Sequence, residues 1–184
     1  MSEVILELVE EFFQQRKYFT AWSGNLVLVK KAKTEDNSDI GFILDETGVE
    51  YIPTAIIKPI AWHTCKITTR ILETFPEILE FAKENKEKKF SEWFKGESFA
   101  KILVIPQLPS HIDLKQKVLE KLQSTGINHL ITIPVILTGV INKIEARKVY
   151  SSPICDLLRV LKFYKLISLS QEQMELPLRW SCCY

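Results

Sequence analysis

The sequence predicts an α/β fold in a single domain, with a mixed central sheet and helices on both faces. Three observations lead to this prediction. An apolar stripe at helical spacing opens the chain, extended segments separated by turn residues fill residues 18–61, and two continuous apolar runs flank an amphipathic segment between residues 102 and 133. Strand, helix and strand in that order are typical of a parallel crossover.

The composition is that of an ordinary globular protein. Of the 184 residues, 46% are apolar and 26% are charged, and the length is near that expected of one domain. No window approaches the roughly 20 apolar residues that span a bilayer, and no early segment has the layout of a signal peptide. We therefore expect a cytoplasmic protein without membrane association. The four cysteines fit no zinc-binding spacing, so we expect free thiols.

The first elements are a helix and a strand pair. Apolar residues at positions 4, 5, 8 and 12 predict a helix that ends near Gln15. The extended segments 18–20 and 26–29 follow, and Ser23-Gly24-Asn25 between them is typical of a turn. These residues predict a helix followed by a hairpin.

A second pair of extended segments follows a polar loop. Residues 40–44 and 54–61 are predicted strands, and the turn at 45–48 leads us to expect them to be neighbours in the sheet. Pro59 cannot donate a hydrogen bond to a neighbouring strand. We therefore expect a bulge or an early end to the pairing near Pro59.

The second half of the chain alternates helices and buried strands. Strands are predicted at 102–105 and 127–133, and helices near 72–82, 90–94, 114–122, 135–144 and 153–164. Periodicity is weak from Ser168 onward. We expect one α/β domain over residues 1–167 and a tail over residues 168–184.

The stretch from Asp39 to Thr64 carries the clearest functional pattern. It predicts strand, tight turn and strand, opens with a carboxylate and ends at Trp62-His63-Thr64. This layout resembles the catalytic hairpin of the PD-(D/E)XK nuclease superfamily, in which an Asp begins one strand and a Glu-x-Lys triplet lies on the next. The resemblance spans roughly residues 1–135 in element order and implies a restriction-endonuclease-like fold.

The Glu-x-Lys triplet is incomplete in either alignment. If Lys58 is aligned with the triplet lysine, the Glu position falls on Ile56. If the chain is instead aligned at Trp62, as in relatives ending Lys-Gly-Trp-His-Thr, the Glu and Lys positions fall on Lys58 and Ile60. A nuclease of this type needs two carboxylates to hold Mg²⁺. We therefore favour a nuclease-fold protein that does not cleave and that binds nucleic acid or a protein partner.

Two alternatives from other classes stay open. One is an active Mg²⁺-dependent DNA endonuclease, or a Holliday-junction-resolvase-like enzyme, with a migrated metal ligand. The other is a purely structural subunit, and a homodimer is compatible with either.

The resemblance also implies candidate catalytic residues, namely Asp39, Lys58 and His63. In an active enzyme, Mg²⁺ would be held by Asp39 together with Glu7 or Glu10, because a glutamate of the first helix often helps to hold the metal in this superfamily. Glu50 is a further candidate for the migrated ligand. The alternative without a functional role is that the helix acids are solvated and that His63 is a packed, hydrogen-bonded residue.

A candidate nucleic-acid-binding surface follows from the same stretch. Residues 58–70 contain three basic residues and no acid, which suits binding of phosphate groups in DNA or RNA. The predicted members of this surface are Lys30, Lys31, Lys58, His63, Thr64, Lys66 and Arg70.

Charge is also uneven along the chain. The formal net charge is +1, yet residues 101–165 contain 10 basic against 4 acidic residues. Six of the basic residues lie near the end of this segment: Lys143, Arg147, Lys148, Arg159, Lys162 and Lys165. They would suit phosphate contacts if several share a face; otherwise they form a solvated helical surface.

Overall fold

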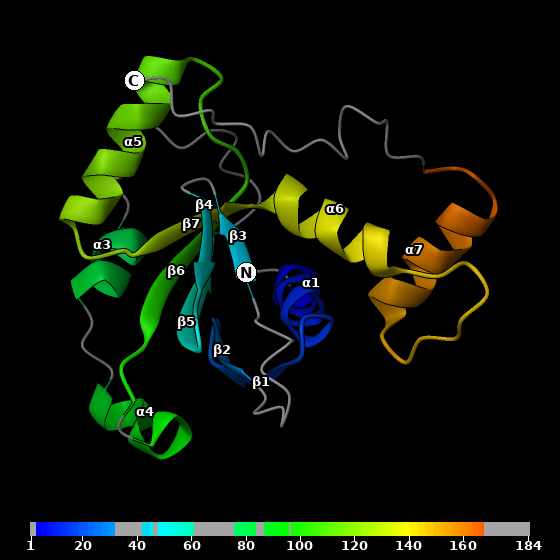
Figure 1. Cartoon of the computed structure of the whole chain (residues 1–184), viewed down its shortest axis with the longest axis horizontal. Coiled ribbons are helices and arrows are strands. Elements are labelled where there is room, and N and C mark those ends of the chain that lie inside the picture. Colours follow the sequence, from blue (N-terminus) through cyan, green and yellow to red (C-terminus); the bar gives the residue numbers. More distant parts are fainter. Residues whose placement is uncertain are drawn as a thin grey trace.

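A computed structural model describes residues 3–31, 42–45, 48–60, 76–83, 87–95 and 97–167, with backbone alone for 42–45, 48–51, 87–89 and 91. Its centre is a five-stranded mixed sheet in the order β1-β2-β5-β6-β7 (Figure 1). The strands are β1 (Tyr18–Ser23), β2 (Leu26–Lys31), β3 (Phe42–Asp45), β4 (Gly48–Tyr51), β5 (Thr54–Pro59), β6 (Ala100–Ile105) and β7 (His129–Thr132). The helices are α1 (Glu3–Gln14), α3 (Pro76–Lys83), α4 (Glu87–Phe94), α5 (Ile112–Ser124), α6 (Ile133–Lys143) and α7 (Pro153–Phe163).

The predicted α/β fold class is confirmed, including the direction of the last strands. β1, β2 and β5 pair antiparallel, whereas β5, β6 and β7 pair parallel. The chain returns from β5 to β6 through α3 and α4, and from β6 to β7 through α5. The turn between β1 and β2 contains Gly24 at φ +63°, a left-handed conformation that glycine adopts without the steric cost of a Cβ.

The predicted pairing of residues 40–44 with residues 54–61 is wrong. β3 pairs with β4 in a separate two-stranded sheet, and the antiparallel neighbour of β5 is β2, with Val27 opposite Ile57 and Lys30 opposite Thr54. The physical reason lies in the burial of β2. Residues 26–29 are buried on both faces of the strand, which requires a central position with covering layers on each side.

Pro59 ends the strand as expected. Pairing between β2 and β5 extends to Ile57, while pairing between β5 and β6 extends to Pro59 and Val104. The next amide, of Ile60, donates to the carbonyl of Val104 over 2.8 Å. The proline therefore lies beyond the last residue pair with β2, where its missing N–H leaves no gap in the antiparallel ladder.

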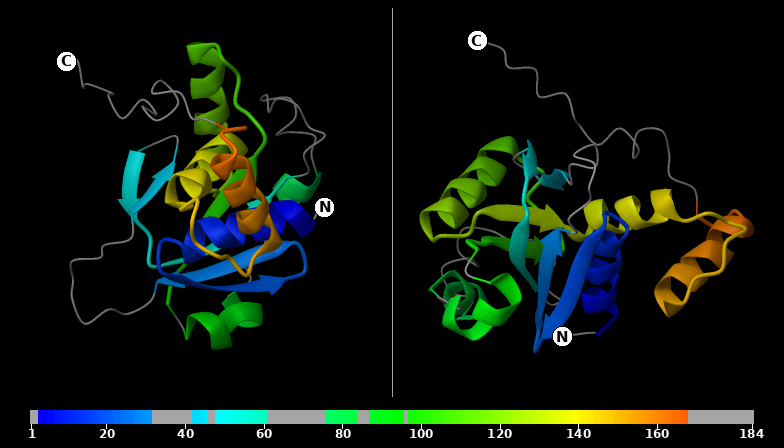
Figure 2. Two further views of the ribbon diagram at one scale, coloured as in Figure 1. Left: turned by 90° about the vertical axis from the view of Figure 1, so that its right-hand side faces the viewer. Right: turned by 60° about the horizontal axis from the view of Figure 1, so that its bottom comes forward.

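Helices cover both faces of the sheet and create two apolar cores. One face packs against α1, α6 and α7, and the other against α3, α4 and α5. Figure 2 shows α6 and α7 extending from the sheet on the side opposite to α5. Within the described ranges, no helix is long and apolar enough to cross a membrane.

Helix α7 is fixed at both ends. At its start, the Ser152 Oγ accepts from the amide of Cys155 over 3.4 Å, as an N-cap residue does. At its end, the amide of Lys165 donates to Lys162 O and that of Leu166 to Leu161 O, with Lys165 at φ +56°. This pattern is a Schellman motif. The Lys162 ammonium also donates to the carbonyls of Ile141 and Ile144, which joins the C-terminal ends of α6 and α7.

Candidate functional site

Lys58, the candidate catalytic lysine, is buried in the face of the sheet that packs against α3, α4 and α5. Its side chain is 6% exposed and lies on the same face of β5 as Ile56 and Ile60. Its Nζ lies 3.4 Å from Oε2 of Glu77, a carboxylate in the first turn of α3 that is about half exposed. An ammonium that is both covered and paired is poorly placed to contact a phosphate.

A second lysine, Lys101, contacts the other end of α3. Lys101 occupies the position on β6 next to Ile56, and its Nζ donates to the carbonyl of Ala82 near the end of α3 over 2.7 Å. Burial lowers the pKa of Lys101 below its ordinary value. Lys58 and Lys101 thus attach the two ends of α3 to the sheet, which gives Lys58 a structural role.

The observed strand pairing changes where the two carboxylates of the resembling hairpin would fall. Ile56, at the Glu position, is 1% exposed and packs in the core. The antiparallel neighbour of β5 is β2, which begins at Leu26 after the turn residue Asn25 and has no carboxylate at its start. Asp39 lies outside the described residues, and the strand that follows it pairs with β4 instead of β5. The reason for choosing Asp39, namely a strand next to β5, is therefore removed.

The two other described lysines of the predicted anion surface lie apart from Lys58. Lys30 is ion-paired with Glu97 at 3.0 Å and lies opposite Thr54, which is about 13 Å along β5 from Lys58 at roughly 3.3 Å per residue. Lys31 points to the other face, where its Nζ donates to Arg16 O over 2.8 Å. Burial, and then the nearby charge of Lys17, lower the pKa of Lys31. The remaining members, His63, Thr64, Lys66 and Arg70, lie outside the described residues.

The two helix-one glutamates proposed as metal ligands point in different directions. Glu7 accepts a hydrogen bond from Ser152 Oγ at the start of α7 over 3.0 Å. Glu10 accepts one from Thr20 Oγ1 on β1. Among the described residues, no group of three or more His, Cys, Asp or Glu side chains could hold a metal ion. Glu50 belongs to β4, for which the backbone alone is described.

A third acid of α1, Glu11, contacts the buried thiol of Cys155. The Cys155 Sγ donates to Glu11 Oε2 over 3.2 Å and lies 3.8 Å from Gln15 Nε2, which donates to it. Burial raises the pKa of the Cys155 thiol to about 12, with the Glu11 carboxylate adding to the effect. Cys155 is therefore a protonated structural thiol that helps to join α1 to α7.

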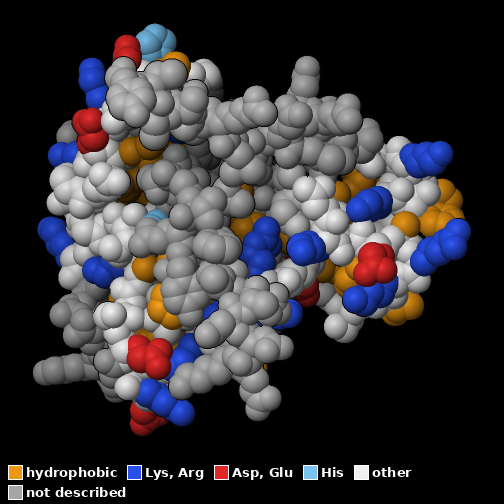
Figure 3. Space-filling model, in the orientation of Figure 1, with side chains coloured by type: hydrophobic (Ala, Val, Ile, Leu, Met, Phe, Trp, Pro, Cys, Tyr) orange, Lys and Arg blue, Asp and Glu red, His pale blue; other side chains and the backbone are white. Residues whose placement is uncertain are grey.

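A cluster of exposed cations lies at the C-terminal ends of α6 and α7. We call it the α6–α7 surface and define it by the exposed residues Lys143, Arg147, Lys148 and Lys165. Lys162 joins the ends of the two helices, which brings residue 143 and residue 165 to the same end of the molecule. Figure 3 shows Lys and Arg side chains gathered at this end.

The basic residues of this region separate into two groups by their contacts. Arg159 is paired with Asp156 at 2.8 Å, and Lys162 donates to backbone carbonyls. Within the part of the chain that the structure describes, none of the four residues of the α6–α7 surface has a carboxylate in ion-pair distance. No described carboxylate therefore neutralises these four charges.

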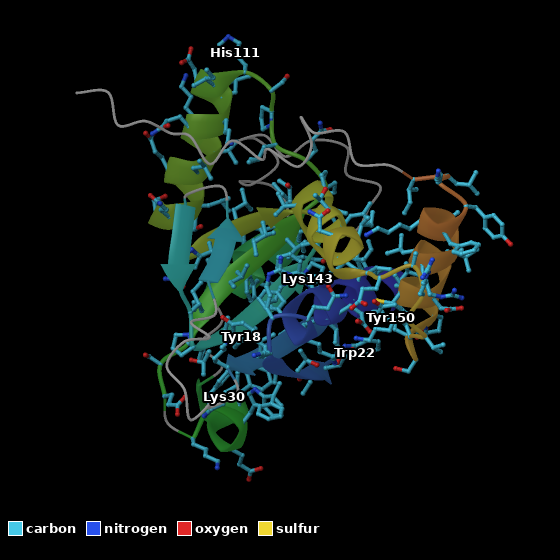
Figure 4. All side chains as sticks on the ribbon, turned by 45° about the vertical axis from the view of Figure 1, so that its right-hand side comes forward. Tyr18, Trp22, Lys30, His111, Lys143 and Tyr150 are labelled. Carbon is cyan, nitrogen blue, oxygen red and sulfur yellow. The ribbon has the colours of Figure 1, made fainter. Side chains whose placement is uncertain are left out.

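Large apolar side chains are exposed in the same segment. Five of them are more than half exposed: Val149, Leu157, Phe163, Tyr164 and Leu166. Tyr150 is half-buried, its hydroxyl accepts from the amide of Glu145, and the Lys148 Nζ lies 5.7 Å from its ring centre. In Figure 4, Tyr150 lies beside α7, and Lys30 lies on the other side of Lys143 from it, toward α4.

The charge of this surface could be read from the sequence, but its exposed aromatic residues could not. Phe163 and Tyr164 continue the apolar periodicity of α7 and look like core residues in the sequence. The structure exposes them because α7 buries its other side, with Cys155 and Leu158, against α1 and α6.

Comparisons of the chain with protein-family models, with curated protein sequences and with solved structures gave no match.

Proposed function

We propose that this protein binds nucleic acid through the α6–α7 surface and that it does not cleave its ligand. The observation that carries the proposal is the cluster of exposed cations Lys143, Arg147, Lys148 and Lys165 at one end of the molecule, none of which forms an ion pair with another described residue. Lysine and arginine that neutralise phosphates supply most of the sequence-independent affinity for nucleic acid.

The local charge supports this choice of surface. Residues 143–166 contain six basic residues and two acids, Glu145 and Asp156, although the net charge of the chain is only +1. Asp156 is paired with Arg159 at 2.8 Å, so its charge is offset locally. A cation-rich end on a nearly neutral protein favours an anionic partner at that end.

The environment of Lys58 supports the second half of the proposal. Its ammonium is buried and paired with Glu77, Ile56 cannot ligate a metal, and β2 begins without a carboxylate. A site that activates water for phosphodiester cleavage needs a bound Mg²⁺ and room for the scissile phosphate. The described residues around Lys58 supply neither two carboxylates nor an open ammonium.

Binding is tested by fluorescence anisotropy with labelled oligonucleotides over a series of salt concentrations. The triple variant Lys143→Ala, Arg147→Ala, Lys148→Ala should weaken binding and reduce the log–log salt slope by roughly two to three, at about 0.7–0.9 per lost phosphate contact. A matched control removes three lysines from the other side of the molecule, Lys83→Ala, Lys115→Ala and Lys117→Ala. If both triple variants lose binding equally, the α6–α7 surface is not the site.

The predicted surface around residues 58–70 is the rival location. The variant Lys66→Ala, Arg70→Ala tests it in the same assay. A reduction of the salt slope by roughly two in this variant, with the α6–α7 triple variant unchanged, would assign binding to that stretch instead. If the wild-type protein binds neither DNA nor RNA at low salt, a protein partner becomes the better proposal.

The second candidate function is an active Mg²⁺-dependent endonuclease. The observation that favours it is the carboxylate of Glu77 3.4 Å from the Lys58 ammonium, since a carboxylate beside a lysine is part of what such a site requires. The test is cleavage of plasmid and four-way-junction DNA with Mg²⁺ or Mn²⁺. Cleavage that is lost in Asp39→Ala, Glu77→Gln and Lys58→Met alike would replace our proposal with this one.

A further inference from the structure

We infer that the α6–α7 surface is built for single-stranded nucleic acid instead of duplex, an inference that rests on the proposed nucleic-acid binding and specifies its ligand. The observation is an exposed aromatic pair among the cations. Phe163 is 56% exposed and Tyr164 is 66% exposed, and Lys165 follows them directly in the chain.

The two rings leave stacking surface open. Their centroids are 5.2 Å apart and their planes meet at 88°, so the edge of one ring faces the other. An edge-to-face pair covers one face of one ring and no face of its partner. Unpaired bases stack on such exposed aromatic faces with little sequence preference.

The helix end holds these residues in place. The Schellman motif fixes the backbone through hydrogen bonds of 3.1 Å from Lys165 to Lys162 O and 2.8 Å from Leu166 to Leu161 O. Lys162 in turn joins this end to α6 over 2.7 and 3.0 Å. The aromatic pair and Lys165 therefore keep a fixed spacing from the cations that follow α6, as a site that reads alternate bases and phosphates requires.

A duplex would use only part of this surface. Its bases are already stacked on one another, so it offers phosphates to the cations and nothing to the faces of Phe163 and Tyr164. A membrane surface would require α7 to lie with its apolar face in the lipid. One side of α7 is already occupied, because Cys155 and Leu158 are buried in the core formed with α1 and α6. The other side exposes Leu157, Phe163 and Tyr164, so binding to lipid vesicles is one of the outcomes of the test.

The experiment compares three labelled ligands by anisotropy at low salt, with heparin as competitor: a mixed-sequence single strand of about 20 nucleotides, the same sequence as duplex, and an abasic strand of equal length. Binding to phosphatidylserine vesicles is measured separately. Wild type should bind the single strand at least roughly tenfold more tightly than either the duplex or the abasic strand. The variant Phe163→Ala, Tyr164→Ala should lose that advantage and keep the wild-type salt slope, because it removes no charge.

The matched control is Phe19→Ala, Trp22→Ala, which removes two exposed aromatic residues from β1. It should bind the single strand as wild type does. Circular dichroism of all variants checks folding, which both substitutions should leave intact since the side chains are exposed.

Two outcomes would overturn the inference, and they separate it from the proposed function. Equal binding of single strand, duplex and abasic strand, with a loss only in the variant that lacks Lys143, Arg147 and Lys148, would leave nucleic-acid binding intact and remove the single-strand preference. Binding to phosphatidylserine vesicles without binding to any oligonucleotide would overturn both and assign the surface to a membrane.

Discussion

At the scale of single residues, α6 lies close to α1 at Gly139. A Cβ at this position would lie 2.6 Å from Phe12 Cε2 and 2.8 Å from Arg16 Nη2. Both neighbours are held, since Phe12 is 1% exposed and the Arg16 guanidinium carbon lies 3.5 Å from the centre of its ring. The Arg16 Nη1 also donates to Phe12 O, and burial lowers the pKa of Arg16 to about 10.

Gly139→Ala should therefore destabilise the protein although alanine is the better helix former. Overpacking a filled site costs about 1–3 kcal/mol, and the gain in helix propensity offsets about 1 kcal/mol of this. Urea unfolding measures the net loss. As a control, Phe12→Leu makes room at the contact, so the loss from Gly139→Ala should be smaller in the Phe12→Leu background. Strictly additive effects of the two substitutions would contradict the contact.

The buried thiol of Cys155 predicts a specific pH dependence. Its folded pKa is raised from 9.0 to about 12, so the thiol ionises in the unfolded chain before it ionises in the folded one. Its contribution to stability is thus complete below pH 9, and is lost as the pH rises from about 9 toward 12. Between pH 8 and 10, wild type should lose about 1 kcal/mol more of its free energy of unfolding than Cys155→Ala does. Unfolding curves that fall in parallel over this interval would show that Cys155 does not carry the effect.

At the scale of elements, α3 is attached to the sheet by charged contacts at both of its ends. Glu77 pairs with the buried Lys58, and Lys101 donates to Ala82 O. Removing the carboxylate leaves a buried ammonium without its partner, whereas replacing the lysine with an apolar residue of similar length removes the charge itself. The two substitutions should therefore change the free energy of unfolding with a different sign or by a different amount.

A double-mutant cycle measures this contact. Glu77→Gln should cost about 1–3 kcal/mol in the wild-type background and close to zero in the Lys58→Met background, while Lys58→Met alone should be nearly neutral. The control is Glu80→Gln, an exposed acid on the same helix, which should change stability by less than about 0.5 kcal/mol. An equal cost for Glu77→Gln in both backgrounds would mean that the ion pair contributes nothing.

At the scale of the whole molecule, the most protected part should be the pair of central strands. All six residues of β5 are buried, and Ile102, Leu103, Val104 and Ile105 of β6 are fully buried. Each of these strands pairs on both sides, whereas within the described ranges β1 pairs only with β2. Local opening of an edge strand requires less free energy than opening of a central one.

Hydrogen exchange followed by mass spectrometry should therefore show the slowest exchange in peptides from β5 and β6, and faster exchange in peptides from β1. The comparison within one sample controls for pH and temperature. Exchange in β1 as slow as that in β5 would indicate that its outer edge is paired or covered.

Much of the element order could be predicted from the sequence. The periodicity of residues 4–12 and of 153–164, the turn at Gly24 and the apolar runs of β6 and β7 each identify an element, because local spacing of apolar residues decides which face can be buried. The end of the strand at Pro59 followed from the missing amide hydrogen. These features depend on short segments, so the order of residues along the chain is enough to predict them.

Only the tertiary structure decided which strand pairs with β5 and whether each lysine is buried or exposed. Four strands precede β5, and the alternation of residues along a strand does not show which strand is its neighbour. β2 is that neighbour because its apolar residues need cover on both faces. In the same way, the sequence alone does not distinguish Lys58 from Lys165, because both are lysines. One is enclosed between a sheet and a helix with a carboxylate 3.4 Å away, and the other is exposed beside two aromatic rings. Solvent access and nearby charge, which depend on segments distant in the chain, decide which lysine is structural and which can meet a ligand.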